Sequence, residues 1–97
     1  MMRNLQGKVA WVTGAGTGIG EAGAIALSQA GMRVILSGRR REKIEQVAAQ
    51  CPGETRIEPL NVSDKDAVNA VAGRIIEEFG RLDVMVASAD RITRMPA

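Results

Sequence analysis

The chain has 97 residues, of which 45% are hydrophobic and 25% are charged, so it can form at most one domain with a small core. A net charge of +2 and an aromatic content of 2% exclude the basic tails and stacking side chains that bind nucleic acids. One cysteine, Cys51, and no histidine exclude an internal disulfide and a zinc site built by this chain alone. No apolar run is long enough for a signal peptide or a membrane span, so we expect a reduced, cytoplasmic protein with no metal and no membrane partner.

The first half of the chain alternates short apolar runs with helical periodicity. Residues 8–13 form a Val-rich run next to Gly7 and Gly14, which predicts a buried strand. Residues 33–37 predict a second one, and Gly31 before it suits the left-handed end of a helix. Between them, residues 18–30 predict a helix whose inner face has three- and four-residue spacing: Ile19, Ala22, Gly23, Ala26, Leu27 and Ala30.

The second half repeats this alternation. Residues 41–50 predict an amphipathic helix, and residues 55–60 predict a third strand that Pro59 weakens. Ser63 is the expected N-cap of a helix that runs to Phe79. Residues 82–87 predict a fourth strand. The inner face of the third helix is expected to carry Val68, Val71, Ala72, Ile75 and Phe79.

The resulting order, β-α-β-α-β-α-β, predicts an α/β fold with a parallel sheet and right-handed crossovers. The expected strand order is 3-2-1-4, the first half of a Rossmann-like, doubly wound sheet. Ligands of such sheets bind beyond the carboxyl ends of the strands, where the strand order reverses. We therefore expect a ligand beyond the first strand.

A glycine-rich segment, residues 13–20, lies at that place. Its glycines permit a tight turn close to a pyrophosphate, and the start of the following helix attracts negative charge. No Lys-Ser/Thr pair follows, so the segment is not a P-loop, and a G-x-G-x-x-G match at Gly18, Gly20 and Gly23 is interpreted as accidental. The alternative is a turn without a ligand. The candidate cofactor-binding residues here are Gly14, Gly16, Thr17, Gly18 and Ile19.

The sequence Thr-Gly-x-x-x-Gly-Ile-Gly of this segment resembles the cofactor motif of the short-chain dehydrogenase/reductase family. The similarity continues through residues 82–86 and extends to about residue 89, which implies that residues 1–89 form an NAD(P)-binding half-domain. The resemblance implies hydride transfer between a nicotinamide and an alcohol or carbonyl carbon. It also implies that Gly14, Gly18 and Ile19 contact the cofactor. In addition, Gly20 would let the first helix pack closely, and the side chain of Thr13 would join the first strand to the fourth.

The end of the second strand bears on the choice of cofactor. Dinucleotide folds that prefer NAD place a carboxylate there, whereas this chain has Gly38 followed by Arg39. A guanidinium suits a 2′-phosphate, and in the family an arginine at this place accompanies NADP. We therefore expect NADP, with NAD as the alternative. A second interpretation is that residues 39–41 form only a solvated basic turn.

Two further positions are candidates through the family resemblance. Asn61 stands where the family has an aspartate that holds the adenine amino group, and the backbone of Val62 would assist it. Asn61 is otherwise a turn residue before the third helix. Ala89 keeps its place near the adenosine ribose, although Asp90 replaces a family glycine.

The catalytic part of the family's pattern has no counterpart here. The family uses a serine and a Tyr-x-x-x-Lys pair, and this chain contains no tyrosine, so no catalytic residue is assigned. Residues 90–97 are expected to be the irregular tail of a truncated chain. Three hypotheses follow: an NADP(H)-dependent oxidoreductase lacking its catalytic half here, a non-catalytic dinucleotide-binding fragment, or an inactive remnant. The resemblance implies a small alcohol or carbonyl substrate and a homo-oligomer for the full-length protein.

Overall fold

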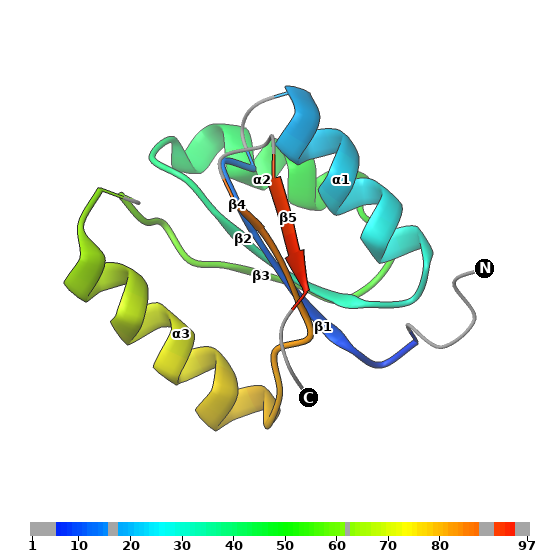
Figure 1. Ribbon diagram of the computed structural model, residues 1–97. Helices are drawn as coiled ribbons and strands as arrows, with labels where there is room; N and C mark the ends of the chain where they lie inside the picture. Colours follow the sequence, from blue (N-terminus) through cyan, green and yellow to red (C-terminus); the bar gives the residue numbers. More distant parts are fainter. Residues whose placement is uncertain (1–5, 16–17, 62, 88–90, 95–97) are drawn as a thin grey trace.

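The computed structural model describes residues 6–15, 18–61, 63–87 and 91–94, and these form one sheet with helices on both faces (Figure 1). The strand order is β3-β2-β1-β4-β5, in which the first four strands are parallel and the last is antiparallel to β4. The order 3-2-1-4 confirms the predicted Rossmann-like fold. The elements in chain order are β1 (Val9–Thr13), α1 (Gly18–Gln29), β2 (Arg33–Ser37), α2 (Arg41–Gln50), β3 (Thr55–Ile57), α3 (Lys65–Phe79), β4 (Val84–Ala87) and β5 (Arg91–Arg94).

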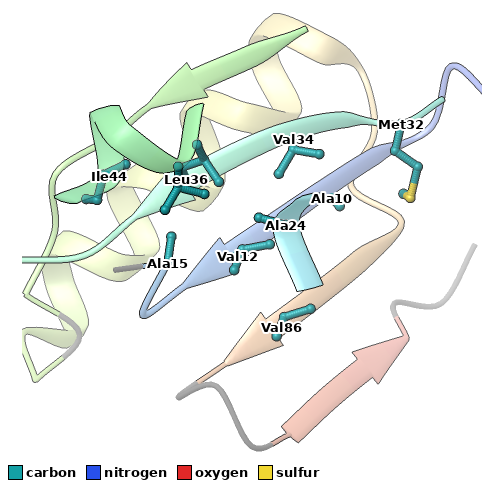
Figure 2. Close-up of a cluster of buried hydrophobic side chains, with 10 residues drawn as sticks. Ala10, Val12, Ala15, Ala24, Met32, Val34, Leu36, Ile44 and Val86 are labelled. Atoms are coloured by element: carbon teal, nitrogen blue, oxygen red, sulfur yellow. The ribbon is translucent and has the colours of Figure 1, made fainter. Parts of the chain in front are cut away.

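The central strand β1 contributes to two cores. All five of its residues are buried, and neighbouring side chains of a strand point to opposite faces of the sheet. Ala10 and Val12 therefore pack in the core beneath α1 and α2, which Figure 2 shows. Val9 and Trp11 pack in the core beneath α3. Burial on both faces explains why β1 is a continuous apolar run rather than an alternating one.

Side chains join β1 to both of its neighbours. The hydroxyl of Thr13 donates a hydrogen bond to the carbonyl oxygen of Val86 at 3.2 Å, which confirms its expected link to the fourth strand. On the other edge, the indole N–H of Trp11 donates to the hydroxyl of Ser37 at 2.8 Å. At the start of β1, the N–H of Val9 donates to a carboxylate oxygen of Asp83 at 2.9 Å. The bonds of Val9 and Thr13 thus join both ends of β1 to β4 and the residue before it, and the bond of Trp11 joins the middle of β1 to β2.

The inner face of α1 differs from the predicted one. Its buried residues are Gly20, Ala24 and Ser28, whereas Ile19 is 65% exposed. Leu27 from the predicted set is only partly buried. The helix lies so close to the sheet that its smallest side chains face inward, so the larger apolar residues do not mark the contact.

Two boundaries also need correction. The N-cap of α3 is Asp64 and not Ser63, because the carboxylate of Asp64 accepts the N–H of Ala67 at 3.1 Å. β3 ends at Ile57, earlier than predicted, although the N–H of Leu60 still donates to the carbonyl oxygen of Gly38 at 2.9 Å. The chain thus continues alongside β2 past Pro59, which has no N–H to donate.

The expected irregular tail is wrong for residues 91–94. These residues form β5, which pairs antiparallel with β4 from Ala87 opposite Arg91 to Val84 opposite Arg94. A parallel strand with one open edge offers unpaired N–H and C=O groups, and an extended segment nearby can satisfy them. Within the described residues, no helix is both long enough and apolar enough to cross a membrane.

We predict that Asp83 makes the stability of the fold depend on pH. Two hydrogen bonds from the Arg81 guanidinium, at 2.8 and 2.9 Å, lower the pKa of the Asp83 carboxyl, and the Val9 N–H acts in the same direction. A lowered folded-state pKa adds stability that is complete above the unfolded pKa, about 4, and is lost as the pH falls through the folded value.

Asp83→Asn should therefore lower the free energy of unfolding by about 1 kcal/mol at pH 7 and flatten its decline below about pH 4. Urea denaturation followed by the emission of Trp11 measures both effects. Asp66→Asn, at an exposed position in the first turn of α3, is the control for the change of charge. Identical pH profiles for wild type and Asp83→Asn would contradict the prediction.

Candidate functional site

The glycine turn begins where β1 ends. Gly14 has a φ of 71°, a left-handed conformation that favours glycine. The following residue, Ala15, is buried, and its N–H donates to the carbonyl oxygen of Ser37 at 3.1 Å. The turn is thereby attached to the end of β2 as well as β1. Gly16 and Thr17, two of the predicted cofactor residues, lie outside the described residues.

Helix α1 starts against this turn. A Cβ atom on Gly20 would overlap the carbonyl oxygen of Gly14 and would lie 2.9 Å from its carbonyl carbon, so only glycine fits at this crossing. This confirms that Gly20 allows close packing. By contrast, a Cβ on Gly18 would meet no atom of the described residues within 4 Å, and Ile19 is exposed beside it. The first turn of α1 therefore presents Gly18 and Ile19 openly beyond the end of β1.

This arrangement suits a negatively charged group. The first N–H groups of an α-helix have no partner within the helix, and the helix dipole adds positive potential at the same end. A glycine turn leading into such a helix is the arrangement in which dinucleotide folds hold a pyrophosphate. Gly18 and Ile19 are both exposed at this end of α1.

Gly38, after β2, lies close to the turn. A Cβ at this position would stand 3.3 Å from the side chain of Ile44 in α2 and 3.8 Å from the backbone nitrogen of Ala15. An added Cβ would need the flexible end of the Ile44 side chain to move by a few tenths of an ångström, whereas its distance to Ala15 is an ordinary van der Waals contact. The next residue, Arg39, is exposed.

Arg39 and Asn61, assigned separately from sequence, contact each other. The guanidinium Nη2 of Arg39 donates to Oδ1 of Asn61 at 3.3 Å. The same Oδ1 accepts the N–H of Ser63 at 3.0 Å, so Asn61 does form a turn before α3. Its contact with adenine stays a prediction. Sequence reasoning missed the pairing of the two side chains, although both follow the ends of adjacent parallel strands. Val62 and Ala89 lie outside the described residues.

Arg39 also differs from the other arginines in its charge environment. Among the seven arginines from Arg33 to Arg81, Arg39 alone has no carboxylate partner within the described residues. The other six form ion pairs with N···O distances up to 3.5 Å: Arg33 with Glu54, Arg40 with Glu42, Arg41 with Glu45, Arg56 with Glu78, Arg74 with Glu58, and Arg81 with Asp83. The positive charge of Arg39 is therefore available to an anion.

Two residue types common in acid–base and metal sites are absent from the sequence. The sequence has neither tyrosine nor histidine, and the described residues contain no group of three His, Cys, Asp or Glu able to hold a metal. Burial raises the pKa of the Cys51 thiol, which disfavours the thiolate needed by a nucleophile.

Comparison with known proteins gives the same fold and family throughout. A model of the short chain dehydrogenase family matches residues 8–96. An uncharacterised oxidoreductase of Staphylococcus aureus (strain USA300) is 40% identical over 92 residues, which are 94% of this chain and 40% of that protein. Dehydrogenase/reductase SDR family member 7 of Mus musculus is 34% identical over 89% of this chain and 28% of its own length. The chain thus spans well under half of these relatives.

Solved structures match as well. A metagenomic short-chain oxidoreductase in complex with NADP is 39% identical, with a TM-score of 0.80 over 84% of this chain and 38% of that one. An NAD⁺-bound xylitol dehydrogenase is 32% identical, with a TM-score of 0.79 over 84% of this chain and 33% of that one.

Two glycines of α1 provide a matched test of the close contact at the turn. Gly20→Ala forces a methyl group against Gly14 and should lower the free energy of unfolding by about 1–3 kcal/mol. Gly23→Ala meets no atom within 4 Å and should raise it by about 0.5–1 kcal/mol, because alanine favours a helix. Thermal and urea denaturation measure both changes. Equal effects of the two substitutions would show that the contact is not tight.

Proposed function

The chain belongs to the short-chain dehydrogenase family, and on that basis we propose that it is the cofactor-binding part of an NADP(H)-dependent oxidoreductase. When bound, the cofactor would supply the hydride exchanged between its nicotinamide ring and an alcohol or carbonyl carbon. Because the chain spans about 40% of the S. aureus relative, this activity is proposed for the whole protein.

The observation that carries the cofactor preference is the charge of Arg39. Arg39 follows β2 and Gly38, and Gly38 stands where NAD-binding folds carry the carboxylate that binds the ribose 2′-hydroxyl. The guanidinium of Arg39 bonds to the Asn61 amide and has no acidic partner among the described residues. A guanidinium donates several hydrogen bonds in one plane and so suits a phosphate. The structural relative with NADP supports this choice, whereas the NAD⁺-bound relative keeps NAD as the alternative.

The other candidate residues have complementary roles in this proposal. Gly14 and Gly18 keep the backbone open to the pyrophosphate, and the start of α1 provides N–H donors for it. Ile19 would cover an apolar part of the cofactor. Gly16, Thr17, Val62 and Ala89 complete the set by family resemblance. The proton donor for the reaction is proposed to come from outside these residues, because the chain has no tyrosine.

The alternative function is a dinucleotide-binding protein without catalysis. Both functions predict cofactor binding, and they differ in turnover. An oxidoreductase consumes NADPH in the presence of a suitable carbonyl compound, whereas a binding protein leaves the absorbance of the reduced nicotinamide unchanged.

Replacing Arg39 tests the proposed cofactor preference. Arg39→Asp should weaken NADPH binding roughly 10- to 100-fold, the value of one or two charge-assisted hydrogen bonds, and change NADH binding little. Dissociation constants can be measured from the emission of Trp11, the single tryptophan, whose indole bonds to Ser37 next to Gly38. Arg41→Asp, which makes the same charge change at an exposed position two residues away, is the control. Equal losses of both nucleotides would remove the preference for NADP.

A further inference from the structure

Arg39 and Asn61 meet because the chain keeps its alignment after the strands end. Leu36 pairs with Ile57 in the sheet, and beyond that pair the N–H of Leu60 donates to the carbonyl oxygen of Gly38 at 2.9 Å. The next residues on each side are Arg39 and Asn61, and their exposed side chains join through the 3.3 Å hydrogen bond.

The orientation of the Asn61 amide follows from its partners. The N–H of Ser63 and the guanidinium of Arg39 are both donors, so the atom that both contact must be the amide oxygen. The backbone bond to Ser63 thus holds the oxygen toward Arg39. The guanidinium has one fixed contact, and its remaining N–H groups can point to a ligand.

The turn alone does not require an amide at position 61. An aspartate accepts a backbone N–H two residues later as well as an asparagine does. The two side chains differ in what they do to Arg39, because a carboxylate would form an ion pair with the guanidinium and neutralise its charge. An amide oxygen holds the guanidinium and leaves the charge in place.

We propose that Asn61 is a specificity-determining positioning residue, which orients Arg39 for a nucleotide 2′-phosphate without neutralising it. This role rests on the proposed NADP(H) function. It differs from a contact with adenine, since adenine is common to NAD and NADP and such a contact would not distinguish them. In this chain the preference for a 2′-phosphate therefore depends on two residues from different strand ends.

The test compares ligands that differ only in the 2′-phosphate. Dissociation constants are measured for NADP⁺ against NAD⁺, and for adenosine 2′,5′-bisphosphate against AMP, with wild type and Asn61→Asp. Asn61→Asp keeps an acceptor for Ser63, and an unchanged melting temperature verifies that it folds. The variant should reduce the preference for the 2′-phosphate by about tenfold, because the new carboxylate competes for Arg39. Asn69→Asp, the same substitution at an exposed position of α3, should leave the preference unchanged.

A double-mutant cycle shows whether Asn61 acts through Arg39. In an Arg39→Ala background, Asn61→Asp should no longer change the ratio of the two dissociation constants beyond the effect of Asn69→Asp. An equal loss for phosphorylated and unphosphorylated ligands, or the same loss with and without Arg39, overturns the inference. A wild-type preference that Asn61→Asp leaves intact overturns the inference alone. A wild type that binds neither nucleotide, or shows no preference for the 2′-phosphate, overturns the proposed cofactor as well.

Discussion

Strand β1 must bury side chains on both faces and satisfy backbone hydrogen bonds on both edges, and the other elements are placed by that requirement. The cores beneath α1–α2 and α3 each receive alternate residues of β1. Pairing with β2 and β4 uses both edges and creates the reversal in strand order. The chain leaves β1 through Gly14 at this reversal, so the candidate site lies beyond the carboxyl end of β1, where the strand order changes direction. The position of the site thus follows from the burial of one strand.

The sequence predicts the order of the first seven elements because burial and helix periodicity are strong local signals. The buried, valine-containing strand β1 shows the first signal, and the amphipathic helix α3, which buries Val71 and Ile75, shows the second. The same reasoning fails at α1, where Gly20 and Ala24 face the sheet and Ile19 is exposed. Hydrophobicity identifies an inner face only when the space between layers admits large side chains. At a close crossing, the lack of a side chain is the relevant property.

The sequence names candidate site residues one by one, but it does not contain their arrangement. The glycines after β1 and the arginine after β2 are visible in the sequence because their chemistry is specific. The contact between Arg39 and Asn61 depends on the pairing of Leu60 with Gly38 beyond the end of β3, which a strand prediction does not contain. Likewise, β5 pairs with β4 through backbone groups that every residue type except proline provides in full, so the residue types at 91–94 did not indicate a strand. Long-range backbone pairing is the information that local patterns lack.

The pairing of β1 has a consequence for the order in which the chain folds. Val9 pairs with Arg33, which follows it closely in the sequence, whereas Ala10 pairs with Val84, which lies much later in the chain. Closing the longer loop costs more entropy, and during synthesis β4 emerges last of the parallel strands. One edge of β1 therefore remains unpaired while β1, α1 and β2 assemble. The long sequence separation between β1 and β4 raises the contact order of the protein. Until β4 is made, the central strand has an unpaired edge on which another extended segment could pair.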